Sequence, residues 1–191
     1  MPADEIGIKI FSGSSSINFA KKMCKHLGTE VGQSKTIIFS EGNTFVQILE
    51  KVRDKDVYIV QTIGLHPNDD FMELLFLIDA FNRASAASVT AIIPYFSYAK
   101  GDKKDEPRVS IRARVCADCL EITGVDRIIT MDLHSPQIQG FFKKPVDHLY
   151  GMPTLCKYIK SKKLDNLVVV SPDAGFAKNA RSYANLLRAS V

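Results

Sequence analysis

The 191-residue chain has no tryptophan, only four cysteines and no run of 18 or more apolar residues. Because a helix needs about 20 apolar residues to cross a bilayer, the sequence predicts no transmembrane segment. The first residues, MPADEIGIKIF, are acidic and then strand-like, whereas a secretory signal begins with basic residues followed by an apolar core. We therefore expect a cytoplasmic protein with no membrane partner.

The chain also has little excess charge of either sign. Its 25 basic and 21 acidic residues give a formal net charge of +4. This excess is too small to indicate a nucleic-acid partner, but it is compatible with small phosphate ligands. Hydrophobic residues make up 46% and charged residues 24% of the chain, which predicts a folded globular protein rather than a disordered one.

The few cysteines include one C-x-x-C pair, Cys116 and Cys119, besides Cys24 and Cys156. Such a pair is found in zinc and redox sites. Here it lies in a segment with helical periodicity and has no second ligand pair at zinc spacing. The sequence therefore predicts reduced thiols that are mostly buried.

Short β-branched runs alternate with segments of helical periodicity along the chain. The predicted strands are 8–11, 36–39, 45–49, 56–61, 89–95, 127–131 and 167–171. The predicted helices are 17–27, 69–86, 110–123 and 176–187. This alternation predicts an α/β fold with a mostly parallel sheet and helices on both faces.

A domain boundary is expected in PVDHLYGMP, where two prolines and a glycine separate strand–helix units. We divide the chain into residues 1–148 and residues 149–191. The last predicted helix ends close to Val191, where a sheet of this kind would normally continue. Residues 149–191 are therefore expected to be the incomplete start of a second, similar domain.

Ligands of parallel α/β sheets bind beyond the carboxyl ends of the strands, so the loops there are candidate sites. The loop GSSS at 13–16 matches neither a dinucleotide fingerprint nor a P-loop. A tight turn whose serines cap a helix is favoured there over an anion site. His66 and His148 are interpreted as ordinary loop histidines.

The sequence DLHS at 132–135 follows an apolar strand and brings an acid and an imidazole close together. On extended backbone, side chains two residues apart point the same way, so Asp132 and His134 would face one ligand. Such a pair suits a divalent metal or acid–base chemistry. A helix-capping Asp132 with a hydrogen-bonded surface His134 is an equally good interpretation.

Two further loops contain possible phosphate ligands. In PDAG, Asp173 precedes a helix, and Gly175 can adopt a positive φ, so the loop could hold an anion and its cation. A helix-capping Asp173 without a ligand is the alternative. In SYAKGDKKDEPR at 97–108, basic residues such as Lys100 could contact a triphosphate, although the signs of charge nearly cancel.

Several segments resemble one enzyme family. The longest, DLHSPQIQGFFKKPVD at 132–147, is similar to the signature of the phosphoribosyl pyrophosphate synthetases, or ribose-phosphate diphosphokinases. The likeness extends to FSGSS, NDDFMELLFLIDAFNRASA, AIIPYFSYAKGDKKD and VVVSPDAG, and covers essentially the whole chain. It implies a type I phosphoribosyltransferase-like fold that transfers diphosphate from Mg-ATP to ribose 5-phosphate. It also implies oligomers.

The resemblance implies roles for particular residues. His134 and Asp173 would hold Mg²⁺, with Asp132 and Asp147 as supporting carboxylates. The residues expected near ATP are Phe39, Glu41, Asn43, Lys100, Gly101 and Asp102. The residues of the diphosphate loop are Asp173, Ala174 and Gly175. No catalytic residue of the family is matched, because the ribose-phosphate loop and the mobile catalytic loop have no counterpart in the sequence.

Some positions depart from the family pattern. Lys100 and Gly101 stand where an Arg-Gln pair is usual, Asn43 replaces a usual Glu, and Phe176 replaces a glycine. Two hypotheses follow. The chain is a diphosphokinase acting in nucleotide biosynthesis, or it is a truncated or degenerate paralogue that associates with a full-length synthetase and regulates it.

Overall fold

The computed structural model describes residues 7–191. The chain divides into two compact units, the first ending at Leu149 and the second comprising Tyr150–Val191. Within the described residues, no helix combines the length and apolar character needed to cross a membrane.

The first unit is built on a five-stranded parallel sheet in the order β1-β4-β5-β6-β7. The strands are β1 (Ile8–Ser12), β4 (Asp56–Val60), β5 (Ser88–Ile93), β6 (Arg127–Met131) and β7 (Val146–Leu149). Ile59, Ala91 and Ile128 of the central strands are buried, as expected for a parallel sheet covered on both faces. The predicted α/β class is therefore confirmed.

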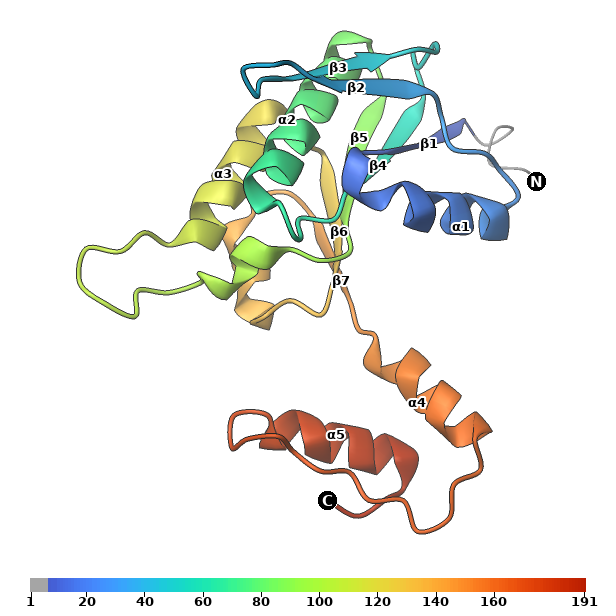
Figure 1. Ribbon diagram of the computed structural model, residues 1–191, viewed down its shortest axis with the longest axis vertical. Coiled ribbons are helices and arrows are strands. Elements are labelled where there is room, and N and C mark those ends of the chain that lie inside the picture. The colour runs from blue at the N-terminus through green and yellow to red at the C-terminus, as the bar shows by residue number, and fades with distance from the viewer. Residues whose placement is uncertain (1–6) are drawn as a thin grey trace. The chain divides into compact units, whose positions relative to one another are not determined.

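Helices cover the two faces of this sheet (Figure 1). They are α1 (Ile17–Leu27), α2 (Pro67–Arg83) and α3 (Arg112–Thr123). Ile10 and Val60 pack with α1, whereas Phe11 and Ile59 belong to the larger core formed with α2 and α3. This division follows from the alternation of side chains along a strand, which sends neighbouring residues to opposite faces.

A separate antiparallel hairpin consists of β2 (Ser34–Ile38) and β3 (Thr44–Ile48). Its turn contains Gly42 at φ 86°, a left-handed conformation that glycine adopts without strain. Val46 and Ile48 pack against the core, and the hairpin lies over α2 (Figure 1). The two strands predicted around SEGN are confirmed, with bounds shifted by one or two residues.

The sequence prediction failed on two strands and one helix. The predicted strand 167–171 is wrong, because only Val168 pairs there, in an isolated bridge with Ser190. An apolar run becomes a strand only beside backbone partners, and such partners are not a local property of the run. Strand β7 was missed because Val146–Leu149 is short and half polar, and helix α4 (Met152–Ser161) was also missed.

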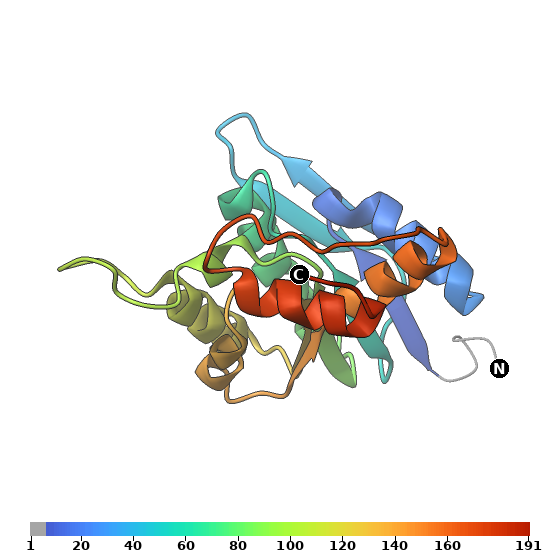
Figure 2. The same cartoon turned by 90° about the horizontal axis from the view of Figure 1, so that it is seen from below.

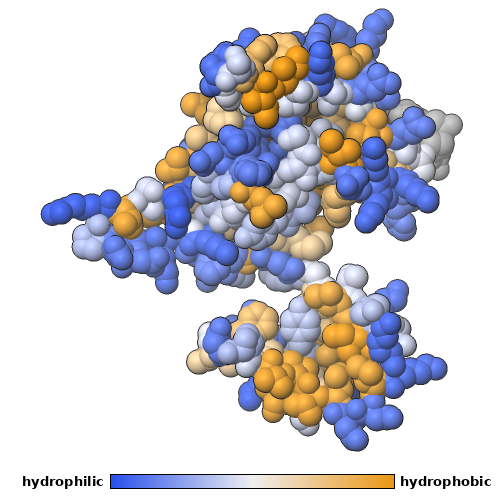
Figure 3. Space-filling view, viewed as in Figure 1, coloured by the Kyte–Doolittle hydropathy of each residue, from blue (hydrophilic) through white to orange (hydrophobic). Residues whose placement is uncertain are grey.

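The second unit contains α4 and α5 (Ala177–Leu187), which pack together (Figure 2). Cys156, Ala180 and Ala184 are its buried apolar side chains, so its core is small. Val168 and Val170 are 55% and 81% exposed, and apolar side chains gather on the face seen in Figure 3. These exposed side chains agree with the lack of a strand at 167–171.

Candidate functional site

The neighbouring strands β5 and β6 end at the same edge of the sheet, and their following loops form a hollow of about 110 Å³. We call it the strand-end hollow. Its lining residues are Tyr95, Phe96, Ala99, Lys100, Met131, Asp132, Leu133 and His134. Three residues singled out from the sequence, Lys100, Asp132 and His134, thus lie around one small cavity. Parallel α/β sheets bind ligands at this edge.

The DLHS turn, residues 132–135, does not begin in an extended conformation. Asp132 has φ 46°, in the left-handed region, so the argument from extended backbone is wrong even though Asp132 and His134 do line the same hollow. Aspartate tolerates this conformation better than most residues, but at some cost in free energy. The helix-cap interpretation is not supported either, because the following 3-10 helix, η3 (Pro136–Phe141), has Ser135 as its N-cap.

Strand β7 holds the DLHS turn through two hydrogen bonds. Asp132 N–H donates to the carbonyl of Leu149 at 3.0 Å, and Leu133 N–H donates to Nε2 of His148 at 2.9 Å. Burial lowers the pKa of His148, and the Asp132 carboxylate opposes this effect by raising it. His148 therefore lies in a strand and bonds to the DLHS turn, so its interpretation as an ordinary loop histidine is wrong.

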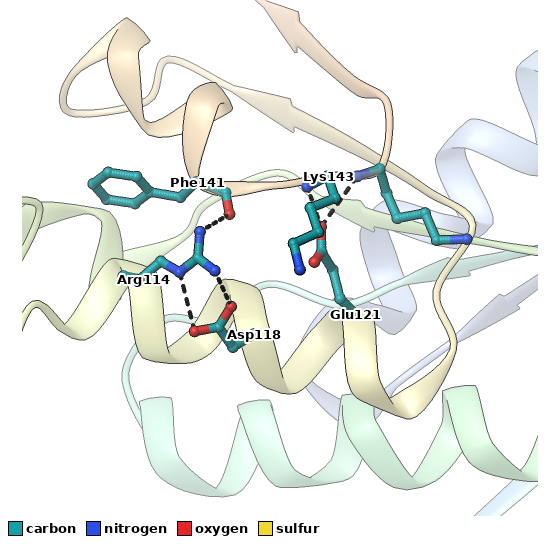
Figure 4. A network of polar contacts seen from close by, with 6 residues as sticks. Arg114, Asp118, Glu121, Phe141 and Lys143 are labelled. Carbon is teal, nitrogen blue, oxygen red and sulfur yellow. Dashed lines mark hydrogen bonds and ion pairs between the residues drawn. The ribbon is translucent and has the colours of Figure 1, made fainter.

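Helix α3 holds the last residue of η3 and the segment that follows it (Figure 4). Arg114 forms an ion pair with Asp118 and donates from Nη1 to the carbonyl of Phe141 at 2.7 Å. The Glu121 carboxylate accepts hydrogen bonds from the N–H groups of Lys143 and Lys144. Lys143 thus contributes its backbone N–H to this clamp, so its side chain is not required for it.

Lys100 ends the short 3-10 helix η2 (Ser97–Lys100), which follows β5. Gly101 is buried, and a Cβ atom there would lie 2.5 Å from Nε of Arg112. Its carbonyl accepts the N–H of Ala113 at 3.1 Å, which fixes η2 to the start of α3. Beyond Asp102, residues 103–110 are exposed on a protruding loop (Figure 2). Lys100 is therefore held on ordered backbone beside the hollow.

Three of the residues predicted to lie near ATP, Phe39, Glu41 and Asn43, are in the turn of the β2–β3 hairpin. The N–H of Phe39 donates to the carbonyl of Asn43 at 2.8 Å, and the Phe39 ring lies 6.2 Å from that of Phe45. None of the three lines the strand-end hollow. The structure of one chain therefore does not bring them to Lys100, and their role at ATP stays a prediction.

The remaining predicted metal ligand of the first unit is Asp147 on β7. Its carboxylate forms a 2.8 Å ion pair with Arg127 and does not line the hollow. Across the part of the chain that the structure describes, no group of three or more His, Cys, Asp or Glu side chains is arranged to hold a metal. Asp132 and His134 are the candidate ligands at the hollow.

These two residues fit a Mg²⁺ ion that arrives with phosphates, because such an ion needs only one or two protein ligands. A carboxylate oxygen suits Mg²⁺, whereas an imidazole nitrogen suits softer metals. The donor set therefore favours Asp132 as a direct or water-mediated ligand. His134 is better suited to a phosphate oxygen or a metal-bound water.

Asp173, Ala174 and Gly175 belong to the second unit. Oδ1 of Asp173 accepts the N–H of Phe176 at 2.8 Å, within the turn that precedes α5. Helix α5 itself has Phe176 as its N-cap and no side-chain cap, so the helix-capping interpretation of Asp173 is not supported. Gly175 is not among the glycines with positive φ, contrary to expectation, and a Cβ there would lie 3.2 Å from Oδ1 of Asp173. Binding of Mg²⁺ or diphosphate by this loop stays a prediction.

The GSSS loop is a tight turn, as predicted, because Ser14–Ser16 form a short 3-10 helix. Its serines do not cap α1, since the N-cap residue Ser16 forms no side-chain cap hydrogen bond. Ser15 donates to Oε1 of Gln61 and to the carbonyl of Thr62, and the N–H of Ser14 donates to the carboxylate of Glu73. The Glu73 carboxylate of the chain itself, and not an external anion, is thus bound at this turn.

All four cysteines are free thiols, and Cys24, Cys116 and Cys156 are buried. Burial, assisted by Cys119, raises the pKa of Cys116 to about 12. This agrees with the predicted reduced thiols and keeps Cys116 a neutral thiol at neutral pH.

The sequence and the fold have close counterparts among known proteins. Residues 8–124 match the family described as the N-terminal domain of ribose phosphate pyrophosphokinase. The ribose-phosphate pyrophosphokinase of Helicobacter pylori is 49% identical over 179 residues, covering 94% of this chain and 56% of the relative. That of Clostridium acetobutylicum is 47% identical over 186 residues, covering 96% of this chain and 58% of the relative.

The crystal structure of phosphoribosylpyrophosphate synthetase from Mycobacterium smegmatis aligns with a TM-score of 0.92 at 38% identity, covering 96% of this chain and 62% of that one. The protein is thus an α/β protein of the phosphoribosylpyrophosphate synthetase fold. The chain belongs to the ribose-phosphate pyrophosphokinase family. It spans 56% and 58% of the length of the two curated relatives described above.

Proposed function

We propose that the first unit binds the phosphates of Mg-ATP in the strand-end hollow, as part of a ribose-phosphate diphosphokinase. One observation carries this proposal: Lys100, Asp132 and His134, which come from two loops more than 30 residues apart, line the same hollow at the carboxyl edge of the sheet. Family membership supports ATP as diphosphate donor, ribose 5-phosphate as acceptor and assembly into oligomers. A cytoplasmic location is part of the same proposal.

The chemistry requires positioning and charge neutralisation rather than covalent catalysis. The Lys100 ammonium, held by η2, provides a point charge for a phosphate oxygen. Asp132 would hold Mg²⁺, and a bound Mg²⁺ neutralises charge that develops on the phosphates. His134 can donate a hydrogen bond to a phosphate oxygen when the hollow is filled.

We propose a matching role for the second unit. Residues 149–191 would begin a second phosphoribosyltransferase-like domain, and Asp173, Ala174 and Gly175 would contribute to diphosphate and Mg²⁺ binding. Phe176 is 39% exposed beside this loop and is larger than the glycine usual in the family. Together with Lys100-Gly101 and Asn43, it predicts weaker Mg-ATP binding than in typical family members.

Isothermal titration calorimetry with Mg-ATP tests the first proposal. We expect Lys100→Ala and His134→Ala each to weaken binding at least fivefold, and EDTA to weaken it in the unmodified chain. Lys103→Ala is the matched control, because Lys103 is exposed in the adjoining loop and forms only a 3.7 Å ion pair with Asp105. Equal affinities for Lys100→Ala and Lys103→Ala would contradict the proposal.

A non-catalytic, regulatory paralogue is the second candidate function. It is favoured by the exposed apolar side chains of the second unit, such as Val168 and Val170, because exposed apolar patches mark association surfaces. A radiolabelled ribose 5-phosphate assay of the chain, alone and mixed with a full-length synthetase, separates the two candidates. Product from the chain alone rules out the regulatory candidate, whereas altered activity only in the mixture favours it.

A further inference from the structure

The main chain of the DLHS turn is held from one side by the end of β7. The ladder between β6 and β7 pairs Met131 with Leu149, and the bond from Asp132 N–H to the Leu149 carbonyl continues it by one residue. The next N–H, that of Leu133, has no strand carbonyl as its acceptor. It donates instead to Nε2 of the His148 side chain at 2.9 Å.

This second bond comes at the point where the backbone leaves the ordinary strand conformation. Asp132 has φ 46°, and Leu133 is only 9% exposed as a residue. A left-handed non-glycine residue persists only where its surroundings hold it, and a buried N–H group must be paired. The imidazole of His148 pairs the Leu133 N–H and thereby helps to hold Asp132 in its left-handed conformation.

The consequence for the site is geometric. Asp132 and His134 flank Leu133, and both line the strand-end hollow. If the Leu133 N–H turned away from His148, the peptide groups on either side of Leu133 would rotate, and both flanking side chains would move relative to Lys100. Phosphate binding by fixed charges depends on such placement.

We propose that His148 is a positioning residue: by accepting the Leu133 N–H it keeps Asp132 left-handed and keeps the side chains of Asp132 and His134 at the strand-end hollow. The ligand part of this proposal rests on the proposed binding of Mg-ATP. His148 itself does not line the hollow, so it acts through the turn and not by contact with a ligand.

The role requires an acceptor atom where Nε2 lies and a ring nitrogen without a proton there. Glutamine can present its Oε1 atom near this position, whereas phenylalanine keeps the ring shape and has no acceptor. His148→Gln is therefore the conservative variant, and His148→Phe removes the hydrogen bond. His148→Ala is a second removal variant in case the phenylalanine ring is not accommodated. His66→Phe, at an exposed histidine of the same unit, is the matched control.

The experiment measures three quantities on the full chain: the Leu133 amide exchange rate, the backbone φ of Asp132 from NMR couplings, and Mg-ATP affinity by calorimetry. We expect the removal variants to speed Leu133 exchange at least tenfold, to abolish the positive φ of Asp132 and to weaken Mg-ATP binding at least fivefold. His148→Gln should keep the Leu133 exchange rate and the Mg-ATP affinity within twofold of the unmodified chain, and it should keep the original φ of Asp132. His66→Phe should change none.

An unchanged φ and an unchanged affinity in folded His148→Phe or His148→Ala would overturn the proposal, even if the thermal midpoint fell, because His148 would then contribute stability alone. If the unmodified chain does not bind Mg-ATP, the proposed function fails while φ and exchange still test the positioning. In that case, a positive φ at Asp132 in both removal variants would still overturn the positioning role of His148.

Discussion

The hydroxyl of Thr36 donates a 2.6 Å hydrogen bond to the carboxylate of Glu73, which ties the β2–β3 hairpin to helix α2. Glu73 is only 3% exposed. Its carboxylate also accepts hydrogen bonds from the N–H and hydroxyl of Ser14 and from Nε2 of Gln61. A buried carboxylate is tolerated because these donors replace water, so one side chain joins the GSSS loop, the hairpin and the sheet.

Replacement of Glu73 by glutamine should therefore destabilise the protein. The amide keeps the shape but turns NH₂ hydrogens toward groups that donate, and we expect a loss of about 2–3 kcal/mol in the free energy of unfolding in urea. Asp79→Asn is the control, because Asp79 forms an exposed i,i+4 pair with Arg83. It should cost less than about 0.5 kcal/mol. Similar losses for the two variants would argue against the Glu73 network.

Gly101→Ala should test the close approach of Gly101 to Arg112. The added methyl group would lie 2.5 Å from Nε and 3.0 Å from Cβ of Arg112, so we expect a loss of about 1–2 kcal/mol in unfolding free energy. Adding Arg112→Ala should recover part of this lost stability, since the effects of substitutions at contacting residues are not additive. Gly140→Ala is the control, because a Cβ there meets nothing within 4 Å. A loss at Gly101 that Arg112→Ala leaves unchanged would point to another cause.

The buried thiol of Cys116 predicts a pH dependence of stability. Its pKa is raised to about 12 from the ordinary 9.0, so the folded state favours the neutral thiol. The stabilising contribution is complete below about pH 9 and is lost as the pH rises through the interval toward 12. Urea unfolding between pH 8 and 10.5 should show this decline, and Cys116→Ala should reduce it. Rapid alkylation of Cys116 in the folded chain at pH 8 would contradict the assignment.

Glu121→Ala should loosen the segment that α3 holds. Without the carboxylate, the N–H groups of Lys143 and Lys144 lose their acceptor. We expect their amide exchange to accelerate at least tenfold, equivalent to about 1.4 kcal/mol. Glu106→Ala, in the exposed loop, should leave both rates unchanged. Exchange that is equally fast in both variants would mean that the clamp contributes nothing to local order.

Much of the first unit follows from local sequence. Apolar runs predicted the strands that became β1, β4, β5 and β6, since a strand buried on both faces needs them. Gly28 and Gly124 end α1 and α3 in left-handed conformations, at φ 70° and 97°, for which glycine is the residue with the least strain. The sequence also singled out Lys100, Asp132 and His134 before their shared hollow was known.

The tertiary structure alone decided the rest. The pairing of His148 with Leu133, the left-handed Asp132 and the burial of Glu73 depend on segments 15 to 59 residues apart, whose contacts no local pattern encodes. The segment 167–171 is apolar enough for a strand, but it forms only one isolated bridge and is not a strand. Local sequence thus determined which segments form strands and helices in a covered sheet, and long-range packing determined which polar groups meet at its edge.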